Sequence, residues 1–229
     1  MQCDLADLSA VSAAADKLLA ELPRLDVLVC NAGVMAKPPA LSRDGYEIQF
    51  ATNHLGHALL VKKLLPLLTS RSDGRVVMVS SETWRGAPSG GIQFDRLKTT
   101  QDMMPVMGRW LRYGQSKLAN MLYARQLARK VPGVLSFSIT PGVVNTALVS
   151  ESSLLAKAVV YLTSRVQTVE EGAHNLLWAV AASRDAIKPG AFYQPVGVLS
   201  TLATKASEDE ALTERLWEWT EAELERWMS

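Results

Sequence analysis

Apolar residues along this chain follow two periods, one typical of amphipathic helices and one typical of buried strands. Positions spaced three and four apart predict helices, over residues 8–22, 45–68, 116–130, 168–183 and 207–228. Short continuous apolar runs predict buried strands, over residues 26–30, 75–79 and 134–139, with a possible short edge strand at 190–193. Strands that alternate with helices indicate a parallel sheet covered by helices, and therefore an α/β fold.

Composition fits one soluble globular domain, which we assign to residues 1–229. The chain is 48% hydrophobic and 21% charged, and it contains no repeat or linker. Its net charge of +1 gives no electrostatic reason to expect nucleic acid as a partner. Two distant cysteines, a polar N-terminus and the lack of a long apolar stretch predict a reducing, cytoplasmic location without a membrane span.

The segment YGQSK, residues 113–117, carries the clearest chemical signal. Tyr113 and Lys117 are four residues apart at a helical run, so their side chains share one face of the helix. A nearby ammonium group favours the phenolate, and we expect Lys117 to lower the pKa of Tyr113 toward working pH. Such a tyrosine exchanges protons with an alcohol or carbonyl oxygen. The spacing alone also fits an exposed helical pair.

Polar and turn residues follow three of the predicted strands. Asn31 follows the first, Ser80 and Ser81 follow the second, and Pro141-Gly142 follows the third. Ligands bind beyond the carboxyl ends of parallel strands, so this fold would bring these residues to one place. Each segment taken alone is more often an ordinary turn or helix cap.

Taken in order, the motifs resemble those of the short-chain dehydrogenase/reductase family. The matching segments are CNAG (30–33), NHLGH (53–57), RVVMVSS (75–81), YGQSK (113–117) and TPGVVNT (140–146). NHLGH, with the long interval between Ser81 and Tyr113, is most similar to the branch of retinol dehydrogenases and WW-domain oxidoreductases. The resemblance spans nearly the whole chain. It implies a Rossmann-like, doubly wound parallel sheet.

The resemblance assigns four catalytic positions. Tyr113 would be the general acid/base, and Lys117 would lower its pKa and hold the nicotinamide ribose. Ser81, rather than Ser80, would hydrogen-bond the substrate oxygen. Asn53 would lie at a helix irregularity and hold a water that links Lys117 to solvent.

The resemblance also implies a nicotinamide cofactor, with NADP favoured over NAD. Asp4 would lie near the adenine ring. The other cofactor-binding positions are the catalytic pair and residues of the turns that follow the strands. They are Asn31, Ala32, Gly33, Tyr113, Lys117, Pro141, Gly142, Val144 and Thr146. The implied reaction interconverts an alcohol and a carbonyl, on a small-molecule substrate. Apolar residues between Ala147 and Thr168, the family's variable substrate loop, hint that this substrate is apolar, and the family implies a homo-oligomer.

One family feature is missing from this sequence. Members begin with a strand, a glycine-rich turn (TGxxxGxG) and a helix that receives the cofactor pyrophosphate. Here the first residues match the end of the family's third strand, so we expect an N-terminally truncated domain that lacks roughly 60 residues. Loss of the central first strand would leave an apolar edge at Asp26–Cys30.

Three explanations for this difference stay open: a fragment, a degenerate remnant, or a partner chain that completes the sheet. The intact downstream motifs favour the first. The alternative function is that of a catalytically inactive remnant that acts only by protein association.

Two further groups have simple interpretations. His54 and His57 lie on one helix without a third ligand nearby, so we expect packing and no metal site. Trp217, Trp219 and Trp227 in the last helix predict a helix that covers the core or forms a dimer, with a substrate lid as the alternative.

Overall fold

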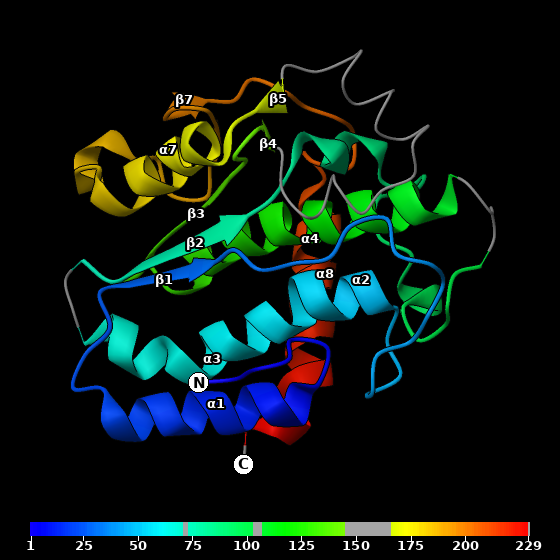
Figure 1. Cartoon of the computed structure of the whole chain (residues 1–229), viewed down its shortest axis with the longest axis horizontal. Helices are drawn as coiled ribbons and strands as arrows, with labels where there is room; N and C mark the ends of the chain where they lie inside the picture. Colours follow the sequence, from blue (N-terminus) through cyan, green and yellow to red (C-terminus); the bar gives the residue numbers. More distant parts are fainter. Residues whose placement is uncertain (71–72, 103–106, 145–165, 229) are drawn as a thin grey trace.

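The computed structural model describes residues 1–70, 73–102, 107–144 and 166–228, and its centre is a five-stranded sheet (Figure 1). The strand order is β1-β2-β3-β6-β7, in which β1 to β6 run parallel and β7 pairs antiparallel with β6. The strands are β1 (Val27–Cys30), β2 (Arg75–Val79), β3 (Leu135–Ile139), β6 (Phe192–Gln194) and β7 (Val198–Leu199). A separate parallel pair joins β4 (Val143–Val144) to β5 (Val166–Gln167).

Helices connect these strands and cover the sheet. The α-helices are α1 (Leu8–Glu21), α2 (Ile48–Phe50), α3 (Gly56–Thr69), α4 (Gly108–Lys130), α7 (Val169–Ala181) and α8 (Glu210–Leu224). A π-helical turn (Ala51–Leu55) joins α2 to α3, and short 3₁₀ turns occupy Glu82–Gly86, Phe94–Arg96, Arg184–Ala186 and Glu225–Trp227. None of the helices in the described ranges has the length and apolar content that crossing a membrane requires.

The sheet is apolar on both faces, and each face has its own helices. Val76 and Met78 of β2 belong to the core on the side of α3 and α4, whereas Val77 and Val79 belong to a second core with Ala179 of α7. Alternate residues of a strand point to opposite faces, so a continuous apolar run is what a sheet covered on both sides requires. Figure 1 shows α7 on one side of the sheet and α3, with α1 outside it, on the other. The doubly wound arrangement is confirmed.

The C-terminal helix α8 covers the core, which is one of the roles that its tryptophans predicted. Leu216 and Leu224 are completely buried. Trp219 makes edge contacts with Tyr46 and Phe50, and Trp217 stacks on Tyr123 of α4. These rings join α8 to the helix that carries Tyr113.

Three expectations need correction. The helix predicted over 45–68 begins at Ile48 and changes to a π turn at Ala51–Leu55, which no apolar period reveals. Helix α4 begins at Gly108, five residues before Tyr113. The strand near residues 190–193 is not an edge strand, because β6 is bonded to β3 on one side and to β7 on the other.

Strand β1 pairs with β2 alone within the described residues, and it therefore forms an edge at Asp26–Cys30 as expected.

Candidate active site

Tyr113 and Lys117 lie on one face of α4, one turn apart, and both side chains are buried. The Lys117 ammonium nitrogen is 5.7 Å from the centroid of the Tyr113 ring. It donates a hydrogen bond of 2.9 Å to the carbonyl of Val79, the last residue of β2. The helix and the end of the central strand thus hold the lysine beside the phenol.

The pKa of Tyr113 differs from the expectation. Burial raises the pKa of Tyr113 to about 12, and a hydrogen bond with the Ser81 hydroxyl acts in the opposite direction. Burial also lowers the pKa of Lys117 to about 8. The expected lowering of the tyrosine pKa is wrong for this structure, because the loss of hydration on burial outweighs the hydrogen bond with Ser81. At neutral pH the phenol is protonated and can donate a proton.

The two serines after β2 have different surroundings. Ser80 is buried and donates its hydroxyl to the carbonyl of Lys117 at 2.7 Å. Ser81 forms the hydrogen bond with Tyr113 and accepts another from the backbone N–H of Thr83. Ser81 is therefore the serine beside the phenol, and Ser80 supports the backbone of α4.

Asn53 lies in the π turn, completely buried, and its amide joins three segments. Its oxygen accepts from the Val34 N–H at 2.8 Å, and its nitrogen donates to the Val34 carbonyl and to the Ser116 hydroxyl, each at 2.9 Å. The turn after β1 and helix α4 are fixed to each other through this side chain.

Gly33 lies within this group, whereas its neighbours are more exposed. A Cβ atom at Gly33 would be 2.8 Å from the Asn53 amide oxygen and 3.7 Å from the Lys117 nitrogen. Asn31 and Ala32 are exposed just beyond β1. Asp4, at the exposed N-terminal segment, accepts a hydrogen bond from the Ala6 N–H and has no described contact with the other predicted site residues.

A cavity of about 690 Å³ opens beyond the ends of β2, β3 and β6. Its walls are Ser81, Glu82, Thr83, Thr140, Gly142, Val143, Gln167, Gln194, Pro195 and Val198. Gly142 has a φ of 84°, a conformation that glycine adopts without strain. Pro141 is next to this wall, whereas Val144 packs against Gly172 of α7, so that Val143 faces the cavity in its place. Thr146, like most of the expected substrate loop, lies outside the described residues.

Several cavity residues carry no sequence signal. Gln194 at the end of β6 donates to the Glu82 carboxylate at 2.6 Å, across 112 positions of sequence. The Gln167 side chain packs on Gly142, brought there by the short β4–β5 pair. Only the strand pairing, of β6 with β3 and of β5 with β4, could have placed these residues at the site.

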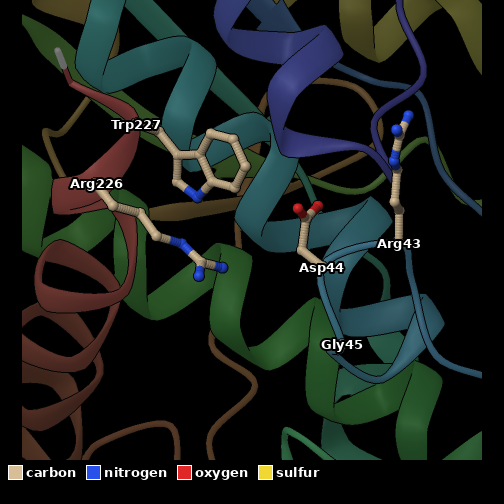
Figure 2. Close-up of a pocket in the computed structure, with 5 residues that line it drawn as sticks. All are labelled: Arg43, Asp44, Gly45, Arg226 and Trp227. Atoms are coloured by element: carbon tan, nitrogen blue, oxygen red, sulfur yellow. The ribbon is translucent and has the colours of Figure 1, made fainter.

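Figure 2 shows a second, shallow cavity of about 490 Å³ that contains none of the predicted site residues. It is lined by Arg43, Asp44, Gly45, Arg226 and Trp227. Arg43 is paired with Asp7 at 2.7 Å, the Asp44 carboxylate accepts the Leu8 N–H, and the Arg226 guanidinium lies over the Trp227 ring. These charges have partners within the protein, so the cavity gives no sign of catalysis.

The two histidines of the π turn region pack within the protein. His54 Nε2 is 3.0 Å from the Thr220 hydroxyl, and His57 Nδ1 is 3.0 Å from the Asn53 carbonyl. Burial lowers the pKa of His54 to about 3 and that of His57 to about 4. Among the described residues, no group of three acidic, cysteine or histidine side chains could hold a metal ion.

Comparison with known proteins identifies the family of this arrangement. A family model described as short chain dehydrogenase matches residues 1–91. The short-chain dehydrogenase/reductase drtF of Aspergillus calidoustus is 34% identical over 99% of this chain and 76% of its own length. The chain belongs to the short-chain dehydrogenase/reductase family. Retinol dehydrogenase 14 of Mus musculus is 38% identical over 96% of the chain, so this short-chain dehydrogenase/reductase lies near the retinol dehydrogenase branch.

The chain spans 65% of the length of that retinol dehydrogenase. A solved structure of an uncharacterized protein from Mycobacterium paratuberculosis is 30% identical, with a TM-score of 0.72 over 97% of this chain and 74% of the other. This similarity supports the Rossmann-like fold of the short-chain dehydrogenase/reductase chain described above.

Proposed function

We propose that this protein interconverts an alcohol and a carbonyl by hydride transfer with a nicotinamide cofactor, and that Tyr113 is its general acid/base. The observation that carries the proposal is the convergence of Tyr113, Lys117, Ser81 and Asn53, from α4, the end of β2 and the π turn. Of these residues, Ser81 lines a cavity of about 690 Å³. Membership of an oxidoreductase family supports it.

The described residues fit a nicotinamide group at this position. The cavity lies at the carboxyl ends of parallel strands, where this class of fold binds ligands. Gly142 and Val143 line it beside Ser81, and Gly33 has no side chain next to Lys117. By the family resemblance, Asn31, Ala32, Gly33, Pro141 and Gly142 would hold the cofactor, with Asp4 near the adenine. Val143 faces the cavity in place of Val144, and Thr146 lies outside the described residues. When bound, the nicotinamide supplies or accepts the hydride.

Residues of the chain would transfer the proton, stabilise charge on the substrate oxygen and hold the reacting groups in place. The Tyr113 phenol, protonated at neutral pH, would donate its proton to the carbonyl oxygen in the reductive direction. The Ser81 hydroxyl would stabilise charge on the same oxygen. Lys117, with a pKa lowered to about 8, would hold the ribose and return a proton to Tyr113, while Asn53 keeps the lysine helix in place. We propose NADP as the preferred cofactor and a small alcohol or carbonyl as substrate.

A kinetic test uses two matched tyrosine variants on α4. Tyr113→Phe should lower kcat on a panel of carbonyl compounds by at least about 100-fold, because a positioned acid contributes that much, and it should leave cofactor binding intact. Tyr123→Phe removes a hydroxyl on the same helix within the core beside Trp217 and should retain activity. If the wild-type protein binds neither NADPH nor NADH and turns over no carbonyl, the proposal fails and action by protein association becomes the better hypothesis.

A further inference from the structure

Arg112, the residue before Tyr113, has a guanidinium group that is buried and bonded to three separate segments. Its Nε donates to the Glu47 carboxylate at 3.1 Å, and its two terminal nitrogens donate to the carbonyls of Gln101 and Lys37 at 3.2 and 2.9 Å. Lys37 lies in the loop that follows Asn31–Gly33, and Gln101 lies in the segment that precedes α4. One side chain therefore connects the loop after β1 to the start of the Tyr113 helix.

Glu47 is the partner that makes this arrangement possible. It is completely buried, and its second oxygen accepts the Phe50 N–H at 2.8 Å, which caps α2 just before the π turn of Asn53. Burial raises the pKa of Glu47, and the charge of Arg112 opposes this change. The pair thus fixes the beginning of the segment that carries Asn53 as well as the residue next to Tyr113.

Gln101 strengthens the same connection. Its backbone has a φ of 51°, which is uncommon for a residue other than glycine. Its side-chain oxygen accepts from Gln115 of α4 at 3.2 Å, and its carbonyl accepts from Arg112. The loop before α4 is therefore held on both sides of Tyr113.

Stability alone does not explain a buried ion pair of this kind. Taking both charges out of water costs about as much as their attraction returns, and apolar residues of similar size are often as stable. A planar guanidinium with three bonds does fix direction and distance, which apolar contacts do not. Small errors of position at a reacting group reduce rates strongly.

We propose that Arg112, held by Glu47, is a positioning residue for the reaction. It sets Tyr113 and the loop that follows Asn31–Gly33 at the distance that proton and hydride transfer require. It does not touch the substrate. This inference rests on the proposed function and assigns a role to two residues outside the family motifs.

The test separates positioning from folding in the whole protein. Arg112→Met leaves the Glu47 carboxylate buried and unpaired, so this variant should lose stability or fail to fold. The double variant Arg112→Met/Glu47→Leu removes both charges and should recover part of the melting temperature that Arg112→Met loses, while the Phe50 N–H loses its acceptor. We expect its kcat to stay about 100-fold below wild type, with little change in the KM of the carbonyl substrate. Arg112→Lys keeps the positive charge but lacks the planar guanidinium that bonds three segments. This variant should also fold, and its kcat should also stay low.

Arg129→Met provides the matched control on the same helix. Arg129 pairs with Glu210 at the exposed end of α4, so its loss should change neither kcat nor the pH profile. A double variant with wild-type kcat would overturn the inference and leave the pair a purely structural one, even while the wild-type protein reduces carbonyls. A wild-type protein without cofactor binding or turnover would instead overturn the proposed function, and this inference with it.

Discussion

The Asn53 side chain donates a hydrogen bond of 2.9 Å to the Ser116 hydroxyl, across 63 positions of sequence. Ser116 in turn donates to the Tyr113 carbonyl at 2.8 Å. The π turn is therefore bonded to the turn of α4 that contains both Tyr113 and Lys117. A π turn shifts the side chains that follow it relative to an α-helix, and such turns are frequent at functional sites.

Replacing Asn53 should affect stability and catalysis together. Asn53→Ala removes two bonds to the part-buried backbone of Val34 and one to the buried Ser116 hydroxyl, which keeps its bond to the Tyr113 carbonyl. We expect the free energy of unfolding to fall by about 3 kcal/mol, since each of the three lost hydrogen bonds contributes about 1 kcal/mol. Urea denaturation measures this change. A stability equal to that of wild type would show that water replaces the amide and that the connection is weak.

The buried histidines predict an acid-sensitive fold. His54 and His57 have pKa values of about 3 and 4 in the folded protein, below the value of about 6.5 expected for an unfolded chain. The unfolded chain therefore binds more protons below pH 6.5, and stability falls as the pH drops from there toward 4. At pH 5 the loss should be roughly 2 kcal/mol for each histidine relative to pH 7.5.

Thermal or urea melts at pH 5 and pH 7.5 measure this dependence. His54→Gln should remove about half of it, because one of the two groups is then absent. His174→Gln, at an exposed position of α7, is the control and should leave the difference as in wild type. Equal stability at the two pH values would mean that these histidines are not buried in solution.

Cofactor choice is open to a direct measurement. A ligand at 100 times its dissociation constant that binds the folded state alone adds about 2.7 kcal/mol of stability. For a chain of this size the melting temperature should rise by about 5–10 °C. We expect NADPH to give the larger rise at equal concentration. A rise with NADH only would show that the preference for NADP is wrong.

Local sequence patterns were sufficient to predict the layers of the fold. The apolar run Val76–Val79 has to be covered by helices on both faces of the sheet, and the apolar residues of the helices recur with the helical period. The spacing of Tyr113 and Lys117 was equally sufficient for their shared face. The pKa of Tyr113 was not predictable, since it depends on how completely the phenol is buried. The Arg112–Glu47 pair joins positions 65 residues apart, and the Gln194–Glu82 bond joins positions 112 residues apart. Contacts over such sequence separations cannot be predicted from a local pattern.

Gly33 offers a test of the contact between the turn after β1 and Asn53. Gly33→Ala places a methyl group 2.8 Å from the Asn53 amide oxygen, so either the turn or the amide has to move. Overpacking of this kind costs about 1–3 kcal/mol, and kcat should fall because Asn53 is bonded to the helix of Tyr113 and Lys117. Gly133→Ala is the matched control, since nothing lies within 4 Å of a Cβ atom there. In the double variant Gly33→Ala/Asn53→Ala the methyl group has room, so the two stability losses should not add. Strictly additive losses would show that the cost of the methyl group at Gly33 does not come from its contact with Asn53.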